Sequence, residues 1–275
     1  MPSKAKKAIE EALEEARMQL DLGTKDIEDL LRLPYLLTHQ FFHESLTHLT
    51  LCHNKISILP KEISVLVQLE HLNLFNNHLT DICPDITQLN KLRILNLGMN
   101  RLTQLPKGFG AFPLLEILDL SYNNLSETSL PNNFFELNSL RALYLGDNDF
   151  EHIPARIQNL TDLQVLSFRD NDLVDVPPEL GRCTQLREVH LQGNRLLVLP
   201  PEFGQLDLTG SRQAVKLDNN PWIELIADQL LIGPSHVMEY LRTDAYRFHY
   251  TRFMEVNQAP PPKANKSKKI SRKLN

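Results

Sequence analysis

Histidine and cysteine side chains gather in one short part of this sequence, where they resemble the ligands of a zinc site. The group consists of His48, Cys52, His53, His71 and His78. Imidazole and thiolate are ligands that zinc prefers, and two of these histidines would lie roughly 5 Å apart on neighbouring strands. A metal site also needs converging ligands and an ordered second shell, whereas this spacing divides the side chains between strand and rim. We therefore favour ordinary exposed histidines and expect no metal, with zinc as the minor alternative.

A second group, of carboxylates, lies farther along the chain. It consists of Asp119, Asp147, Asp149, Asp170 and Asp172, with Arg169 among them. A calcium site is one interpretation, but these aspartates form no contiguous metal loop. We instead predict a charged rim that steers a partner with basic groups, in which Arg169 can reach a carboxylate or an aromatic face of the partner.

Common catalytic motifs are missing from the sequence. There is no P-loop, HExxH, GxSxG or kinase signature, and the pair Gly108 and Gly110 lacks the third glycine of a dinucleotide loop. Scattered Ser, His and Asp residues occur in any chain of this size. The sequence therefore predicts a protein that is not an enzyme, with no catalytic residue and no cofactor.

The candidate residues are spread over a sequence that repeats itself. Three segments follow one another at intervals of 23 residues: LEHLNLFNNHL (69–79), LRILNLGMNRL (92–102) and LEILDLSYNNL (115–125). The same pattern, LxxLxLxxNxL, recurs at 46–56, 140–150, 163–173 and 186–196, with weaker copies at 17–27 and 212–222. A fixed period of this length indicates a stack of similar units. We predict nine short parallel strands, one in each copy.

Each position of the repeat has a predicted role. Leu72 and Leu74 alternate with polar residues and should point inward from a strand. The ninth-position asparagine lies where the chain leaves the strand, and its amide can satisfy backbone groups of the turn. The second half reads LPxxIxxL, which predicts a short helical or 3-10 segment. The fold class is therefore α/β: a leucine-rich-repeat solenoid, a right-handed horseshoe with a concave parallel sheet, short convex segments and helical caps.

Composition divides the chain into four regions. They are 1–19, an N-terminal capping helix; 20–220, leucine-rich repeats; 221–257, a C-terminal cap; and 258–275, a basic disordered tail. In the first region Ile9, Leu13 and Ala16 should face the core, although a partner-binding helix is the alternative. Residues 245–256 are expected to be an edge segment packed on the repeats. The extra length at 126–137 has no assigned function.

The net charge of -5 is unevenly distributed. Residues 259–275 carry six basic side chains and no acidic one, so the rest of the chain has a charge of -5 - 6 = -11. An acidic body argues against nucleic-acid binding, which depends on neutralising phosphate. The tail is predicted to be solvated, and contact with an acidic partner, nuclear import or a membrane surface are the alternatives.

The compartment is predicted from the N-terminus and the cysteines. MPSKAKKAIEEALEEARMQL lacks the apolar stretch of a secretory signal, and no window approaches the roughly 20 apolar residues of a membrane helix. Cys52, Cys83 and Cys183 are odd in number and form no CxxC, which fits free thiols in a reducing compartment. We expect a cytoplasmic protein that is a monomer on its own and does not insert into a membrane.

Solvent-facing strand positions carry the candidate binding residues. On the concave face they are His71, Phe75, Asn96, Met99, Asp119, Tyr122, Tyr144, Asp147, Arg169 and Asp170. Aromatic and Met side chains in one exposed patch are typical of binding hot spots, whereas scattered tolerated apolar residues are the alternative. Gly98 and Gly146 are expected to leave dimples between the large side chains. The sequence thus predicts a protein-binding concave face, centred on the middle repeats.

The 23-residue LPxxIxxL repeat resembles that of cytoplasmic leucine-rich-repeat proteins associated with Ras signalling. The likeness extends to MPSKAKKAIEEALEEAR, LTLCHNKISILP, LVDVPPELGRCTQL, NNPW and SKKISRKLN, and covers essentially the whole chain. The resemblance implies an adaptor that binds the last LIM domain of PINCH, and through it the complex of integrin-linked kinase, PINCH and parvin at focal adhesions. It also implies an inhibitory influence on Ras-dependent signalling. Direct regulation of a Ras-family GTPase or a phosphatase is the alternative, because other solenoids of this type bind such proteins.

Overall fold

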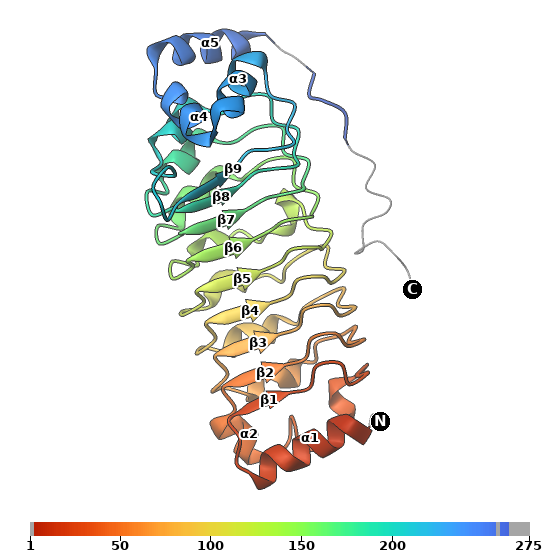
Figure 1. The fold of residues 1–275 in the computed structure, drawn as a ribbon. Helices are drawn as coiled ribbons and strands as arrows, with labels where there is room; N and C mark the ends of the chain where they lie inside the picture. Colours follow the sequence, from red (N-terminus) through yellow and green to blue (C-terminus); the bar gives the residue numbers. More distant parts are fainter. Residues whose placement is uncertain (1–2, 257–258, 264–275) are drawn as a thin grey trace. The chain divides into compact units, whose positions relative to one another are not determined.

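The computed structural model describes residues 3–256 and 259–263, which form two compact units divided in the sequence between Leu140 and Arg141. Parallel strands follow one another in chain order in both units (Figure 1). The predicted fold class, a leucine-rich-repeat solenoid with nine strands, is confirmed. The predicted tail at 258–275 lies outside the described residues apart from 259–263, and the predicted region boundaries stay predictions.

All described strands are short and lie at the predicted place in their repeats. The first unit contains β1 (Gln19–Asp21), β2 (His48–Thr50), β3 (His71–Asn73), β4 (Ile94–Asn96) and β5 (Ile117–Asp119). The second contains β6 (Ala142–Tyr144), β7 (Val165–Ser167), β8 (Glu188–His190) and β9 (Ala214–Lys216). Pairing is in register, so Leu72 lies between Leu49 of β2 and Leu95 of β4, and all three are buried. The central leucine of each strand therefore stacks on that of the next and forms the core.

Short 3-10 helices form the other side of each repeat. They are η1 (Leu30–Arg32), η2 (Lys61–Val65), η3 (Pro84–Gln88), η4 (Phe109–Ala111), η5 (Glu127–Ser129), η6 (Phe134–Glu136), η7 (Ala155–Asn159), η8 (Pro178–Arg182) and η9 (Pro201–Gln205). Proline occupies the first position of η3, η8 and η9, where its missing N–H costs nothing. Apolar residues such as Ile63 and Ile86 turn into the core from these segments, as predicted.

Buried asparagines connect each repeat to the one before it. Asn100 donates from Nδ2 to the carbonyls of Leu74 at 3.0 Å and Leu97 at 2.9 Å. Its Oδ1 accepts a hydrogen bond of 3.0 Å from the backbone N–H of Leu79. Asn77 and Asn123 repeat this arrangement. The predicted structural role of the asparagine is confirmed, because one amide pairs backbone groups of two successive turns.

Helices cover the first repeat of the first unit. Helix α1 (Ser3–Glu14) packs against β1 and buries Ala5, Ile9 and Ala12, while the short α2 (Gln40–Ser45) buries Phe42. The predicted inward face of α1 was partly wrong. Leu13 is only half-buried and Ala16 is exposed, because the helix ends at Glu14 and Ala16 has a φ of 50°.

Three helices follow the last strand of the second unit: α3 (Glu224–Ile232), α4 (Pro234–Leu241) and α5 (Asp244–Glu255). The break between α3 and α4 falls at Gly233, as the Gly-Pro pair predicts. The expectation of an edge segment at 245–256 was wrong, because the Thr243 hydroxyl caps a helix there. Tyr246 on α5 is buried and its hydroxyl donates to the carbonyl of Leu199 at 2.5 Å, so α5 is anchored to the repeats. None of the helices in the described residues is long and apolar enough to cross a membrane.

Surface side chains pair one repeat apart. Arg93 forms an ion pair with Glu116, and His152 Nδ1 lies 2.8 Å from Asp175 Oδ1, in both cases between residues 23 apart. Lys91 Nζ donates a hydrogen bond to Gln68 Oε1, again between residues 23 apart. The strand register therefore also sets which surface groups are neighbours.

We expect Asn100→Ala to lower the free energy of unfolding by about 2 kcal/mol or more, because it leaves several buried backbone groups unpaired. Urea denaturation followed by circular dichroism measures the change. Asn90→Ala is the matched control, since Asn90 is exposed. Equal stability of the two variants would contradict the structural role of the asparagine.

Candidate functional site

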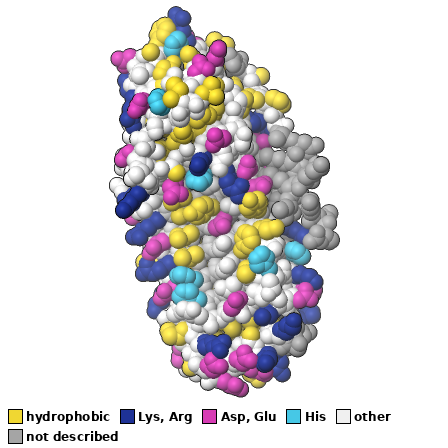
Figure 2. Space-filling model, viewed as in Figure 1, with side chains coloured by type: hydrophobic (Ala, Val, Ile, Leu, Met, Phe, Trp, Pro, Cys, Tyr) yellow, Lys and Arg dark blue, Asp and Glu magenta, His cyan; other side chains and the backbone are white. Residues whose placement is uncertain are grey.

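Solvent-facing side chains of the strands and of the turns that follow them form the surface predicted to be concave. We call this surface the strand face; it contains the third, fifth, seventh and eighth positions of each repeat. Figure 2, viewed as in Figure 1, shows hydrophobic side chains on this side interrupted by charged ones and by histidines. All ten predicted binding residues lie on strands or on the turns that directly follow them, six in the first unit and four in the second.

Phe75, Met99 and Tyr122 occupy successive repeats of the first unit, and we call them the first-unit cluster. All three side chains are half-buried. The predicted dimple at Gly98 is absent, because Phe75 Cδ2 lies only 3.1 Å from where a Cβ of Gly98 would be. A side chain at residue 98 would push the Phe75 ring away, so glycine allows this ring to lie against the backbone.

Left-handed backbone holds two members of this cluster in place. Met99 has a φ of 55° and Tyr122 a φ of 57°, a conformation that large L-residues rarely adopt. Such strain costs about 1–3 kcal/mol and persists only where the surroundings impose it. The repeat therefore fixes both side chains at the start of the turn, so their backbone is ordered before any partner arrives.

Asn96 and Asp119 have a role that sequence reasoning missed. The Oδ1 of Asn96 accepts a hydrogen bond of 2.9 Å from the N–H of Gly98, and Asp119 Oδ1 accepts one of 2.9 Å from Ser121. Asn73 does the same for the N–H of Phe75 at 3.0 Å. These Asx turns start the chain reversal after β3, β4 and β5. Recurrence of Asn or Asp at the fifth repeat position was the available sequence signal.

His71 lies on the strand face beside His48, and their ring centroids are 4.0 Å apart. Burial, and after it the neighbouring His48, lowers the pKa of His71 below its usual value. His53 contacts other groups: its ring meets Phe75 edge-on and its Nδ1 lies 2.8 Å from Asn76 Nδ2. Burial also raises the pKa of the Cys52 thiol. Within residues 3–256 and 259–263, no group of three or more His, Cys, Asp or Glu side chains is arranged to hold a metal ion.

Tyr144, Asp147, Arg169 and Asp170 form the second-unit cluster. Arg169 Nη1 lies 2.7 Å from Asp170 Oδ2, so the predicted rim contains an internal ion pair. The dimple predicted at Gly146 is absent as well, because Arg169 Cγ lies 2.8 Å from where a Cβ of Gly146 would be. Tyr144 is half-buried on β6, next to Ser167 of β7. The Arg169 side chain therefore packs against Gly146 of the preceding repeat, and 30% of it is exposed.

Lowering the pH from about 7.5 to about 5.5 is expected to destabilise the protein. The pKa of His71 is depressed in the folded state, so the unfolded chain binds more protons below the ordinary histidine pKa of about 6.5. The stability associated with neutral His71 is therefore present above the ordinary histidine pKa of about 6.5 and is lost as the pH falls below it. Urea midpoints measured across the range should depend less on pH in His71→Gln than in the exposed control His249→Gln. An unchanged pH dependence in His71→Gln would contradict the assignment.

Comparisons with known proteins agree with this architecture. A model described as a leucine-rich repeat region matches residues 83–198, and a leucine-rich repeat model matches 45–66 and 68–89. Ras suppressor protein 1 from Mus musculus and from Homo sapiens is 56% identical over 69 residues, which is 25% of this chain and 25% of each relative. The match thus spans a quarter of the length of these curated relatives.

Solved structures with the same fold include two plant receptor ectodomains. The leucine-rich-repeat ectodomain of the Arabidopsis receptor kinase HAESA, in complex with a peptide hormone, has a TM-score of 0.60 and 28% identity over 74% of this chain and 34% of the receptor chain. That of GASSHO1/SCHENGEN3 from Arabidopsis thaliana has a TM-score of 0.54 and 34% identity over 65% of this chain and 22% of the other. The repeats, the strand register and these matches lead to the same conclusion: the chain has the leucine-rich-repeat fold.

Proposed function

We propose that the chain is a non-enzymatic adaptor that binds a LIM domain of PINCH through its strand face. The observation that carries this proposal is the first-unit cluster, in which Phe75, Met99 and Tyr122 lie half-buried on successive repeats of a binding fold. Aromatic and Met side chains give a large contact area for a modest loss of rotamer freedom. The choice of partner rests on the family resemblance, supported by the 69-residue likeness to Ras suppressor protein 1.

The same proposal assigns the chain to a cellular setting. By binding PINCH it would link the complex of integrin-linked kinase, PINCH and parvin at focal adhesions to Ras-dependent signalling, in the cytoplasm. Of the two receptor ectodomains of similar fold, that of HAESA is in complex with a peptide hormone ligand, and that of GASSHO1/SCHENGEN3 is in complex with CASPARIAN STRIP INTEGRITY FACTOR 2. That precedent supports ligand binding by this repeat architecture, although neither receptor indicates a LIM domain.

Direct regulation of a Ras-family GTPase or a phosphatase is the second candidate. It is favoured by the likeness to a protein named Ras suppressor protein 1. A pull-down with the full chain, comparing an isolated LIM domain of PINCH with GTP-loaded Ras, separates the two. Retention of the LIM domain alone supports the adaptor, and retention of Ras alone supports the second candidate.

Tyr122→Gly is the sharpest test of the first-unit cluster. It removes the ring at a position whose φ is 57°, where glycine is better accommodated than any other residue, so the fold should be preserved. We expect LIM-domain affinity to fall by about 1–3 kcal/mol, the usual range for an aromatic anchor. Calorimetric titration measures the affinity, and Lys107→Glu, in the exposed turn before η4, is the control. Loss of binding in the control but not in Tyr122→Gly would exclude the strand face.

The second-unit cluster is tested independently. Arg169→Glu reverses a charge that is paired with Asp170, and Tyr144→Ala removes the half-buried ring on β6. Each should weaken LIM-domain binding, the first mainly by slowing association. Surface plasmon resonance at two salt concentrations resolves the two rates. Unchanged association and dissociation in both variants would restrict the proposed interface to the first unit.

A further inference from the structure

A short proline-rich segment, 259–263, lies against the second unit beside helix α5. Pro260 and Pro261 line a cavity of about 240 Å³. Most of the remaining wall is apolar and comes from two neighbouring repeats and from α5; it includes Val176, Leu197, Tyr250, Phe253 and Met254. Met254 is 58% exposed, so apolar surface remains uncovered at this place although the segment is seated there.

Arg195 joins this segment to the repeats. Its side chain is only 9% exposed, and its guanidinium donates to the carbonyl of Asp172 and to the Glu151 carboxylate, each at 3.1 Å. The same guanidinium also donates to the carbonyl of Pro261. A buried charge needs several partners, and a proline can offer only a carbonyl because it has no N–H. Arg195 therefore binds the segment through the one backbone hydrogen-bonding group that a proline has, its carbonyl.

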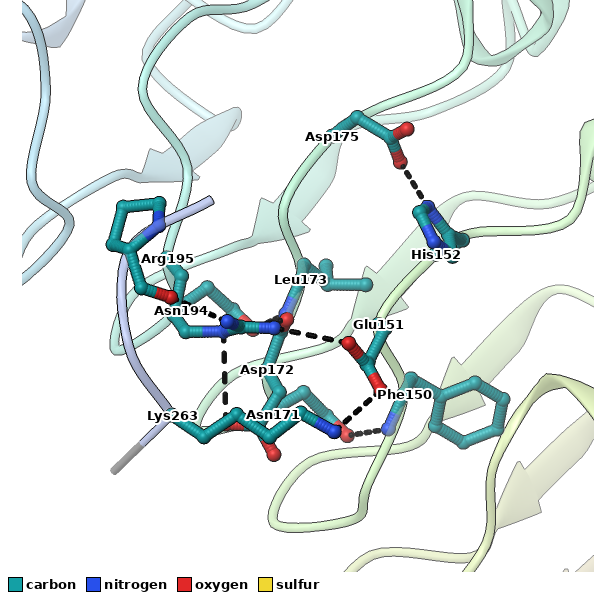
Figure 3. A network of polar contacts seen from close by, with 11 residues as sticks. Phe150, Glu151, His152, Asn171, Asp172, Leu173, Asp175, Asn194, Arg195 and Lys263 are labelled. Atoms are coloured by element: carbon teal, nitrogen blue, oxygen red, sulfur yellow. Dashed lines mark hydrogen bonds and ion pairs between the residues drawn. The ribbon is translucent and has the colours of Figure 1, made fainter. Parts of the chain in front are cut away.

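Lys263 makes the second polar contact. Its ammonium group donates to Glu151 Oε1, so Glu151 lies between Arg195 and Lys263 (Figure 3). The lysine is also the main cause of the lowered pKa of the Glu151 carboxyl. Asp172 adds negative charge, 4.0 Å from Arg195. The site thus presents the Glu151 carboxylate to a lysine that lies two residues after Pro261.

We propose that this groove is a docking site for an extended proline-rich segment that carries a lysine. We call it the proline groove: the apolar cavity beside α5, with Arg195 and Glu151 at its edge. Residues 259–263 are its intramolecular occupant, and a segment of the same chemistry from a partner protein displaces them. The site is separate from the strand face, so it adds a second interaction to the proposed adaptor.

Three features of the groove match three features of such a ligand. The cavity, lined by Tyr250 and Phe253, holds proline rings, the Arg195 guanidinium donates to a backbone carbonyl oxygen, and Glu151 pairs with the lysine. Proline-rich chains are already extended before they bind, so they dock in aromatic grooves at little cost in entropy. A segment tethered to the same chain has a high effective concentration, which makes 259–263 a natural competitor.

The test uses the full chain and a fluorescent peptide, APPPKANK, whose first five residues match 259–263. Wild-type protein should bind it weakly, because the groove is occupied. Lys263→Glu places a carboxylate opposite Glu151 and should release the segment, so that anisotropy shows binding at least about fivefold tighter. Adding Glu151→Gln should abolish that gain, whereas the exposed control Asp162→Asn should not. Arg195 is left intact because its burial makes a folding defect the expected result.

Reversing the charges gives a second and independent readout. Glu151→Lys protein should prefer the peptide APPPEANK to APPPKANK. The proposal is overturned if APPPKANK binds wild type and Lys263→Glu equally, or binds neither. It is also overturned if the gain in peptide affinity of Lys263→Glu survives the addition of Glu151→Gln. A concentration-dependent dimer of the wild type in analytical sedimentation would show that residues 259–263 occupy the proline groove of a second copy. That result would overturn the intramolecular occupancy. LIM-domain affinity should be the same in all of these variants, so failure here is distinguishable from failure of the proposed function.

Discussion

Every strand in the described part of the chain is three residues long, so the fold depends on how the backbone groups outside the strands are paired. The buried asparagine amide meets that need. In Asn100 one side chain binds backbone groups of its own turn and of the preceding repeat. Since an unpaired buried N–H or C=O costs about 1–3 kcal/mol, this pairing is a condition for stacking repeats at all. The leucine core can form only because the chain between strands is paired in this way.

The same turns also present the candidate binding residues. After β3, β4 and β5 the carboxyl or amide oxygen of the fifth position starts the turn, and the eighth position takes the left-handed conformation, so Asp119 and Tyr122 belong to one local structure. The proposed recognition and the folding of the turns therefore involve the same residues of the strand face. A substitution at the fifth position affects both, whereas one at the eighth position changes the surface with little effect on the turn.

The 23-residue period was sufficient to predict the strand positions, the buried leucines, the asparagine pairing and the 3-10 side of each repeat. The dimples predicted at Gly98 and Gly146 were wrong, because the side chains that fill these places, Phe75 and Arg169, belong to neighbouring repeats and their directions depend on packing. The proline groove was missed for a related reason. Arg195 and Pro261 are 66 residues apart, and no local pattern brings them together. Contacts set by periodicity can be predicted from sequence; contacts set by the path of a segment outside the repeats cannot.

The pairing of surface groups between residues 23 apart, as in Arg93 with Glu116 and His152 with Asp175, has a consequence for how this sequence can change. Within each unit the sequence behaves as a two-dimensional lattice, in which a residue has neighbours along the chain and neighbours one period away. A charge reversal at one residue is best compensated by a second reversal at the residue 23 positions away, in the next repeat. Substitutions in neighbouring repeats should therefore covary at that interval. Substitutions on this surface should therefore accumulate together at equivalent positions of successive repeats.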